Sequence, residues 1–132
     1  MPAVLDTHAV VWYLLDSQRL PQPVYSLIDT AAASGSPARI SAVSLVEIVY
    51  LVERGRIAAN AFEMLTGELG RQNPAFTVVP LDSEIARALR RIPRNLVPDM
   101  PDRIIAATAL HLGLPLVTCD QRIQSAGIPT IW

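Results

Sequence analysis

Short apolar runs that alternate with longer helical segments constrain the fold of this chain more than any other feature of its sequence. The runs lack a regular alternation of apolar and polar residues, which is typical of strands in a parallel sheet that is covered on both faces. Strands that are separated by helices favour right-handed βαβ units. We therefore expect an α/β fold, a three-layer α/β/α sandwich around a short central parallel sheet. The predicted strands cover residues 3–5, 38–41, 76–79, 114–118 and 129–132.

The segments between these runs carry the end signals of helices. Pro21 stands at the start of one helix, Gly35-Ser36-Pro37 ends it, and Gly55 ends the next. The predicted helices cover residues 8–15, 21–34, 43–53, 59–71, 83–92 and 102–112. No internal repeat, low-complexity segment or shift in composition divides the chain, so we expect one domain over residues 1–132.

Composition removes several classes of protein. The chain has 11 basic and 12 acidic side chains, a net charge of −1, and all of the basic ones are arginines. This balance excludes nucleic-acid binding through bulk positive charge, and the absence of lysine excludes any mechanism that needs one. The single cysteine, Cys119, excludes a disulfide framework and a cysteine-based zinc site. No apolar stretch reaches the ~20 residues of a membrane span, so we expect a cytoplasmic protein without membrane contact.

Three aspartates occupy positions at which α/β proteins bind ligands, beyond the carboxyl ends of the strands or at the start of a helix. Asp6 directly follows the first predicted strand, Asp120 follows the fourth, and Asp102 opens a helix. Each also has a purely structural interpretation. Asp6 suits the cap of the helix that follows it, and Asp120 suits an Asx-turn before Gln121-Arg122. Asp99 fits an N-cap, with Asp102 favoured in the first turn by the helix dipole.

Glu47 is harder to explain by structure alone. It lies on the strongly apolar predicted helix 43–53 and forms a narrow polar streak with Ser41 and Ser44, because the three residues are spaced by three. A carboxylate on so apolar a helix is expected to be partly buried. Burying it without a partner costs several kcal/mol.

The four acids Asp6, Glu47, Asp102 and Asp120 together predict a metal site. Two carboxylates held ~5 Å apart repel by about 3 kcal/mol at an effective dielectric constant of about 20, so four at one edge of the sheet need cations. Mg²⁺ and Mn²⁺ take carboxylate oxygens and keep several waters for a substrate. Such an ion beside a phosphodiester promotes its hydrolysis. We therefore expect a Mg²⁺- or Mn²⁺-dependent hydrolase of phosphodiester bonds.

Four segments, taken in order, resemble the motifs of one enzyme family. They are Val4-Leu5-Asp6-Thr7-His8 with Trp12 after it, Ser41-Ala42-Val43-Ser44-Leu45-Val46-Glu47-Ile48, Asp99-Met100-Pro101-Asp102-Arg103-Ile104-Ile105-Ala106-Ala107-Thr108-Ala109, and Thr118-Cys119-Asp120. In order and spacing these segments resemble the PIN-domain family, and within it the VapC-type ribonuclease toxins of type II toxin–antitoxin pairs. The resemblance covers the chain from Asp6 to Asp120.

The resemblance implies a Mg²⁺- or Mn²⁺-dependent endoribonuclease that cleaves RNA and is held inactive by a cognate antitoxin protein. It also implies roles for single residues. Asp6 and Asp102 would be the main metal ligands, Glu47 would act directly or through water, and Asp120 would complete the acidic pocket. These four acids are the expected catalytic residues and metal ligands. We further expect a homodimer.

Three other positions match supporting residues of the family. Thr7 and Thr118 correspond to positions whose hydroxyls support the site, and Asp99 corresponds to a less constant acid. Positive charge for RNA is expected from arginines on or near the last two long helices, whose planar guanidinium groups suit phosphate. A solvated helix face is the alternative for them. The candidate RNA contacts are Arg87, Arg91, Arg94 and Arg103.

Two other functions stay open. A PIN nuclease that processes RNA without being a toxin would carry the same acids. A receiver-like, magnesium-binding signalling domain has a similar length and acids at its strand ends, but it needs a lysine that this chain lacks.

Overall fold

The computed structural model describes residues 2–132 and contains one five-stranded sheet in which every neighbouring pair of strands is parallel. The strand order is β3-β2-β1-β4-β5. The chain adds β2 and β3 on one side of β1, and then crosses over to add β4 and β5 on the other side. The order of the strands therefore reverses between β1 and β4, which is the topological switch point of the sheet. The carboxyl ends of β1 and β4 therefore lie at the position where α/β folds most often bind ligands. The strands are β1 (Val4–Leu5), β2 (Ala38–Ser41), β3 (Phe76–Val79), β4 (Leu116–Val117) and β5 (Thr130–Ile131).

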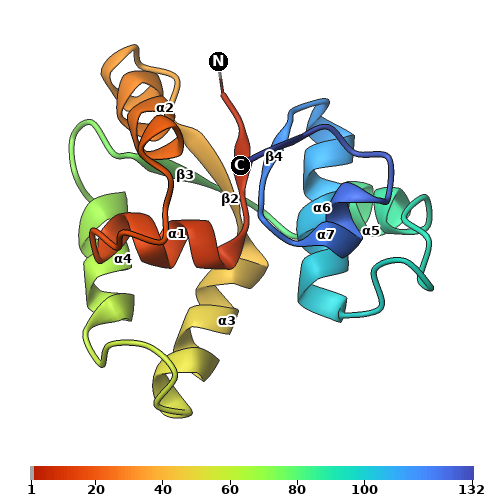
Figure 1. Cartoon of the computed structure of the whole chain (residues 1–132), viewed down its shortest axis with the longest axis horizontal. Coiled ribbons are helices and arrows are strands. Elements are labelled where there is room, and N and C mark those ends of the chain that lie inside the picture. The colour runs from red at the N-terminus through yellow and green to blue at the C-terminus, as the bar shows by residue number, and fades with distance from the viewer. Residues whose placement is uncertain (1) are drawn as a thin grey trace.

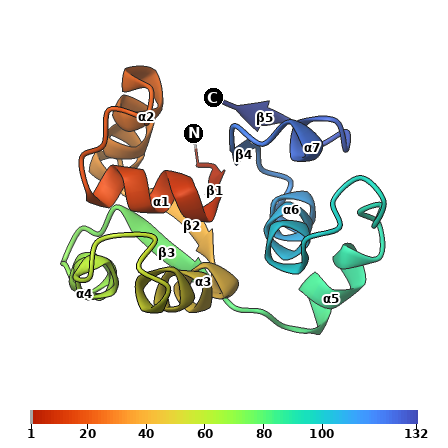
Figure 2. The same cartoon turned by 60° about the horizontal axis from the view of Figure 1, so that its bottom comes forward.

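Seven helices in the described part of the chain cover the two faces of this sheet. Figure 1 and Figure 2 both place α1 to α4 on one side and α5 to α7 on the other. The predicted three-layer sandwich with a parallel sheet is thus confirmed. The helices are α1 (Thr7–Leu14), α2 (Gln22–Ala33), α3 (Ala42–Glu53), α4 (Ala61–Leu69), α5 (Ser83–Leu89), α6 (Met100–Leu112) and α7 (Gln121–Gln124).

The core is divided by the sheet into two apolar clusters, because successive side chains of a strand point to opposite faces. Leu5 and Val117 belong to the cluster under α1 to α4. Their neighbours Val4 and Leu116 belong to the cluster under α5 and α6. All four are fully buried. A fully buried aliphatic side chain of this kind contributes roughly 1.5–3 kcal/mol, so these short strands are held mainly by their packing.

The predicted element boundaries agree closely where local signals are strong. Strands 38–41 and 76–79 have the predicted limits. The helix predicted to start at residue 102 begins instead at Met100, because the Asp99 carboxylate caps it and Pro101 fits its first turn. The predicted helix 83–92 ends at Leu89, and its last residues form tighter turns, with Ile92 N–H donating to the carbonyl of Leu89.

One helix was not predicted. The four-residue α7 follows Asp120, whose side chain caps it. Among residues 2–132, no helix combines the length and the apolar character needed to span a membrane.

Candidate active site

Asp6, Glu47, Asp102 and Asp120 line a single pocket of about 330 Å³, although they lie up to 114 residues apart in the chain. Asp6 directly follows β1, and Asp120 stands three residues after the end of β4. Glu47 comes from α3, and Asp102 comes from the first turn of α6. The predicted meeting of four acids from four elements is therefore what the structure shows. The remaining residues that line the pocket are Thr7, His8, Trp12, Arg19 and Cys119.

Asp6 is held by the start of α1. Its Oδ1 accepts a hydrogen bond of 2.8 Å from the backbone N–H of Ala9, and its own N–H donates to the carbonyl of Val117 in the sheet. Burial raises the pKa of Asp6, while hydrogen bonds from the Thr118 hydroxyl and from Ala9 N–H lower it in part. Asp6 is thus a buried acid at the N-terminus of a helix.

Asp120 and Asp99 are also helix caps. Asp120 Oδ1 accepts from Arg122 N–H at 2.8 Å, and Asp99 Oδ2 accepts from Asp102 N–H at 3.2 Å. The backbone N–H of Asp120 in turn donates to Thr118 Oγ1 at 3.1 Å. The predicted caps of Asp6 and Asp99 are confirmed, and Asp120 caps α7 where an Asx-turn was expected. Capping does not compete with a place in the pocket, since Asp6 and Asp120 do both. Asp99 lines a neighbouring groove instead.

Glu47 is positioned by a hydroxyl network between α1 and α3. Thr7 Oγ1 donates a hydrogen bond to Glu47 Oε1 and lies 2.9 Å from Ser44 Oγ. Ser41 caps α3 through a 3.1 Å hydrogen bond from Val43 N–H. The polar streak seen in the sequence is therefore a capping residue followed by two partners of Thr7. Burial raises the pKa of Glu47, and the hydrogen bond from Thr7 partly offsets it.

Asp102 shows how strongly negative the pocket is. Burial, followed by the charges of Asp99, Glu47, Asp120 and Asp6, raises the pKa of Asp102 from 3.8 to about 7. Within the described residues 2–132, the ion pairs are Arg71–Glu68 and Arg87–Glu84, and neither includes an acid of the pocket. The repulsion is therefore not relieved by a salt bridge within the described chain.

The donor set fits a hard divalent cation, because all four acids offer oxygen atoms and their charges are mutually unfavourable without one. As they stand, no three histidine, cysteine, aspartate or glutamate side chains within residues 2–132 are grouped closely enough to hold an ion.

The predicted arginine contacts lie away from the pocket lining. Arg87 pairs with Glu84 at 3.0 Å, and Arg103 Nε donates to the carbonyl of Ile92 at 3.0 Å, which ties α6 to the end of α5. Arg91 and Arg94 are exposed. None of the four contributes to the lining of the pocket that contains the acids.

Sequence reasoning missed the arginine that does line the pocket, Arg19. It stands in the loop between α1 and α2, and no local pattern marks it. Cys119 is exposed and also lines the pocket. Trp12 is half-buried and lines the pocket while it also packs against the core.

Comparison with known proteins agrees with this geometry. The family model of the PIN domain matches residues 3–129. Ribonuclease VapC22 of Mycobacterium tuberculosis is 30% identical over 132 residues, which cover 98% of this chain and 97% of that relative. The similarity to one named ribonuclease thus extends over almost the whole length of both chains.

Solved structures with the same fold come from toxin–antitoxin complexes. VapBC2 of Rickettsia felis, bound to a DNA fragment from its promoter, aligns with a TM-score of 0.74 and 18% identity and covers 99% of this chain and 98% of that one. DNA-bound VapBC of Salmonella typhimurium aligns with a TM-score of 0.72 and 20% identity, covering 99% and 97%. At this level of identity the likeness establishes the fold.

Proposed function

The chain belongs to the PIN-domain family, and we propose that it is a divalent-metal-dependent endoribonuclease, the toxin of a toxin–antitoxin pair. The observation that carries this proposal is the pocket in which Asp6, Glu47, Asp102 and Asp120 meet, with no salt bridge to any of them from residues 2–132. The relative named as a ribonuclease supports RNA as the substrate. The family match over residues 3–129 removes the receiver-like alternative.

The four pocket acids would hold Mg²⁺ or Mn²⁺, with Asp6 and Asp102 as the main ligands and Glu47 and Asp120 completing the set. When bound, such an ion polarises the phosphoryl oxygen and lowers the pKa of an attacking water. In the hydrolysis, the water oxygen forms a new bond to phosphorus, the bond from phosphorus to the leaving ribose oxygen breaks, and that oxygen ends with a proton. The acids therefore set both where the phosphate binds and how it is oriented.

Other residues of the chain support the four acids. The helix caps restrict Asp6 and Asp120, because each carboxylate is tied to the backbone of the helix that follows it. Thr7 orients Glu47 through its hydroxyl. The hydroxyl of the fully buried Thr118 hydrogen-bonds to the Asp6 side chain and accepts from the backbone N–H of Asp120. These two threonines are positioning residues in this proposal. Asp99 adds negative charge from the neighbouring groove.

The proposed partners are an RNA substrate, a cognate antitoxin and a second copy of the chain. The VapBC complexes among the structural neighbours support an antitoxin. Exposed apolar side chains on the groove beside the pocket, Val46, Tyr50 and Met100, suit a protein contact. As a ribonuclease toxin the protein would act in the cytoplasm, where its RNA substrates are.

Cleavage of single-stranded RNA by the purified protein tests the enzyme. We expect products with Mg²⁺ or Mn²⁺, none with a chelator, and none with Asp6→Asn or Asp102→Asn. Asp82→Asn is the matched control, because Asp82 caps α5 in the same way but lies outside the acidic pocket, and it should cleave like the wild type. Cleavage that persists in chelator, or no cleavage with either metal, refutes the proposal.

Growth tests the toxin role separately. Expression of the wild type should arrest growth, and co-expression of the protein encoded by the adjacent gene should restore it. An active ribonuclease that leaves growth unchanged would favour the non-toxin nuclease of RNA processing.

A further inference from the structure

We propose that Arg19 and an aromatic rim, defined here as His8, Trp12 and Trp132, form a subsite that binds unpaired RNA beside the acidic pocket. Arg19 contacts a phosphate next to the one that is cleaved, and the tryptophans stack on a neighbouring base. This inference rests on the proposed nuclease function and names residues outside the four acids that would hold its single-stranded RNA substrate.

The loop between α1 and α2 holds Arg19 in place. Asp16 adopts φ 52° at the end of α1, which turns the chain so that Ser17 N–H donates to the carbonyl of Trp12 at 2.8 Å. Ser17 Oγ then accepts from Arg19 N–H at 3.2 Å. The next residue, Leu20, is buried in the core and anchors the loop. The backbone of Arg19 is therefore fixed while its side chain remains exposed.

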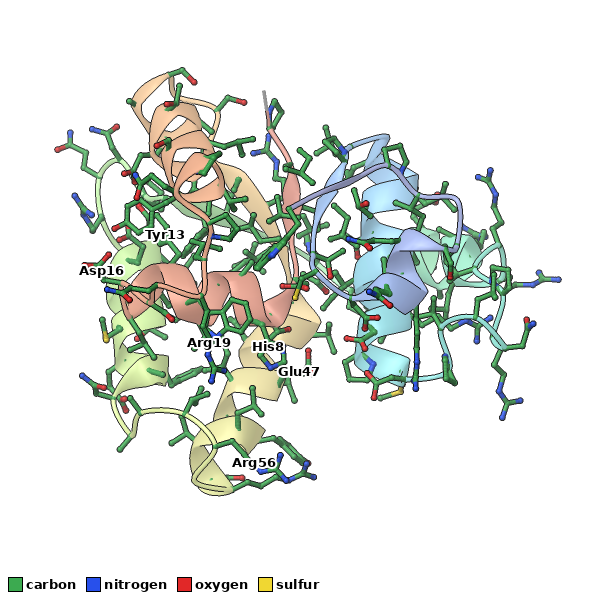
Figure 3. The ribbon with its side chains drawn as sticks, viewed as in Figure 1. His8, Tyr13, Asp16, Arg19, Glu47 and Arg56 are labelled. Carbon is green, nitrogen blue, oxygen red and sulfur yellow. The ribbon has the colours of Figure 1, made fainter. Side chains whose placement is uncertain are left out.

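The exposed side chain of Arg19 is part of the lining of the acidic pocket. Figure 3 shows Arg19, from the loop after α1, close to His8 of α1 and Glu47 of α3, and all three line the same pocket. Arg19 is the arginine among the residues that line this pocket, and it belongs to neither of the ion pairs of residues 2–132. Because the acids repel the phosphates of an approaching RNA, an unpaired guanidinium at the rim is well placed to bind one of them.

The aromatic rim lies against the same arginine. The Arg19 guanidinium carbon is 5.9 Å from the centroid of the Trp12 ring. Trp12 in turn meets His8 at 5.7 Å and Trp132 at 5.6 Å between ring centroids. Trp132 is 39% exposed and Trp12 is half-buried, so aromatic surface remains available to a ligand.

An aromatic surface beside a cation selects unpaired nucleotides. Proteins that bind single-stranded nucleic acid stack bases on aromatic side chains and contact the backbone through arginine. A base within a duplex is already stacked on both faces and cannot be inserted in this way. The rim therefore favours single strands and loops over duplex RNA, and it contacts bases without requiring one sequence.

Kinetics and salt dependence test the role of Arg19. With a short single-stranded oligoribonucleotide of mixed sequence, Arg19→Gln should raise KM about tenfold with little change in kcat, and Arg19→Lys should fall between it and the wild type. The slope of log affinity against log salt should decrease by about 0.7, the effect of one lost phosphate contact on a single strand. A structural effect would not change this slope.

Arg56→Gln is the matched control. Arg56 is also an exposed loop arginine, but it lies at the far end of α3 from the pocket (Figure 3), so its KM and salt slope should stay at the wild-type values. Equal losses in the two variants, or a wild-type KM and slope in Arg19→Gln, would overturn the inference while leaving the nuclease intact.

Tryptophan fluorescence tests the rim without relying on cleavage. Both tryptophans of the chain, Trp12 and Trp132, belong to it, so RNA that is bound there should quench the emission. The measurement is made in a chelator so that the RNA stays intact. We expect the single-stranded RNA to quench the tryptophan emission more than the duplex of the same sequence does. Trp132→Ala should weaken binding about fivefold or more.

The outcomes separate the two proposals. Binding that depends on Arg19 in a protein that cleaves no RNA would support this subsite and refute the nuclease. Equal binding of duplex and single strand would overturn the substrate class. If Arg19→Gln instead changes the thermal shift produced by Mn²⁺ without RNA, Arg19 is a counter-ion of the acids and the inference fails.

Discussion

Each pocket aspartate at a strand end has two roles, which is possible because a carboxylate has two oxygen atoms. In Asp6 and Asp120, one oxygen accepts the capping hydrogen bond of a helix. The same residue then lines the acidic pocket. The cap fixes the direction of the side chain, so a common local motif provides the rigidity that a metal ligand needs.

The cap and the charge of Asp6 can be separated by mutation. Asp6→Asn keeps an oxygen that can accept from Ala9 N–H, whereas Asp6→Ala removes the cap. We expect Asp6→Ala to lower the free energy of unfolding by about 1 kcal/mol relative to Asp6→Asn, with both inactive on RNA. Urea denaturation of the two variants measures the difference. Equal stabilities would show that the cap contributes nothing here.

Asp102 should make the stability of the metal-free protein depend on pH. Its pKa rises from 3.8 to about 7 on folding, so the folded chain holds this proton more tightly than the unfolded chain. The resulting stabilisation is complete below about pH 4 and is lost as the pH rises to about 7. In a chelator at about pH 8, the melting temperature of Asp102→Asn should therefore lie a few degrees above that of the wild type. The melting temperature of this variant should also depend less on pH than that of the wild type.

Asp82→Asn is the control for this experiment, since it retains a capping oxygen on an exposed acid outside the pocket. Its melting temperature should follow the wild type across the pH range. A wild-type pH profile in Asp102→Asn would contradict the assignment of this pH dependence to Asp102.

At the scale of the elements, the site depends on how helix starts meet the sheet. α1 begins directly after β1, α7 begins shortly after β4, and α6 starts at the cap of Asp99. Helix N-termini carry partial positive charge, which favours acids in the capping and first-turn positions. The fold thus brings four carboxylates together. Three of them, Asp6, Asp102 and Asp120, occupy capping or first-turn positions that favour an acid.

Thr7 joins α1 to α3, so Thr7→Val should reduce both stability and activity. The substitution preserves shape but removes the hydroxyl shared by Ser44 and Glu47. We expect the free energy of unfolding to fall by about 1–3 kcal/mol, because Ser44 and Glu47 lose a hydrogen-bond partner while at least partly buried. Cleavage should slow without being abolished.

Thr108→Val provides a matched control for Thr7→Val. Thr108 is equally buried, but its hydroxyl bonds the carbonyl of Ile104 in its own helix. This variant should keep full activity and lose less stability than Thr7→Val. Similar losses of activity in both would remove the positioning role of Thr7.

Two glycines in the helices should respond to alanine in opposite directions. Gly113 ends α6 with φ 66°, so Gly113→Ala should cost about 1 kcal/mol through backbone strain. Gly67 lies inside α4 with open space around it, so Gly67→Ala should gain about 0.5–1 kcal/mol. Chemical denaturation measures both, and cleavage should be unaffected. A change of the same sign in both variants would contradict this interpretation.

At the scale of the whole molecule, a metal ion should stabilise the fold, because carboxylates from four elements repel one another only when the chain is folded. Saturating Mn²⁺ at 100 times its dissociation constant would add about 2.7 kcal/mol to the free energy of unfolding. The shift in melting temperature should be lost in Asp102→Asn and retained in Asp82→Asn. An unchanged wild-type melting temperature would contradict a metal site built by these acids.

The architecture and most of the local geometry could be predicted from the amino-acid sequence. Signals within a few residues account for the strands at residues 38–41 and 76–79, the caps at Asp6 and Asp99, and the positions of the acids at strand ends. Such signals act through backbone hydrogen bonds and apolar periodicity, which neighbouring residues encode. Together with the resemblance to the PIN-domain family, they were sufficient to identify the fold.

Which side chains share the pocket depends on tertiary packing and could not be predicted from local sequence. It brings Arg19 to the acids, leaves Asp99 in a neighbouring groove, and uses Arg103 to tie α6 to α5. The hydrogen bond between Thr7 and Glu47 spans 40 positions of the sequence. These placements depend on how the helices pack against the sheet and on the path of an exposed loop. An exposed arginine has no burial or periodicity signal, so no local pattern could have revealed its partner.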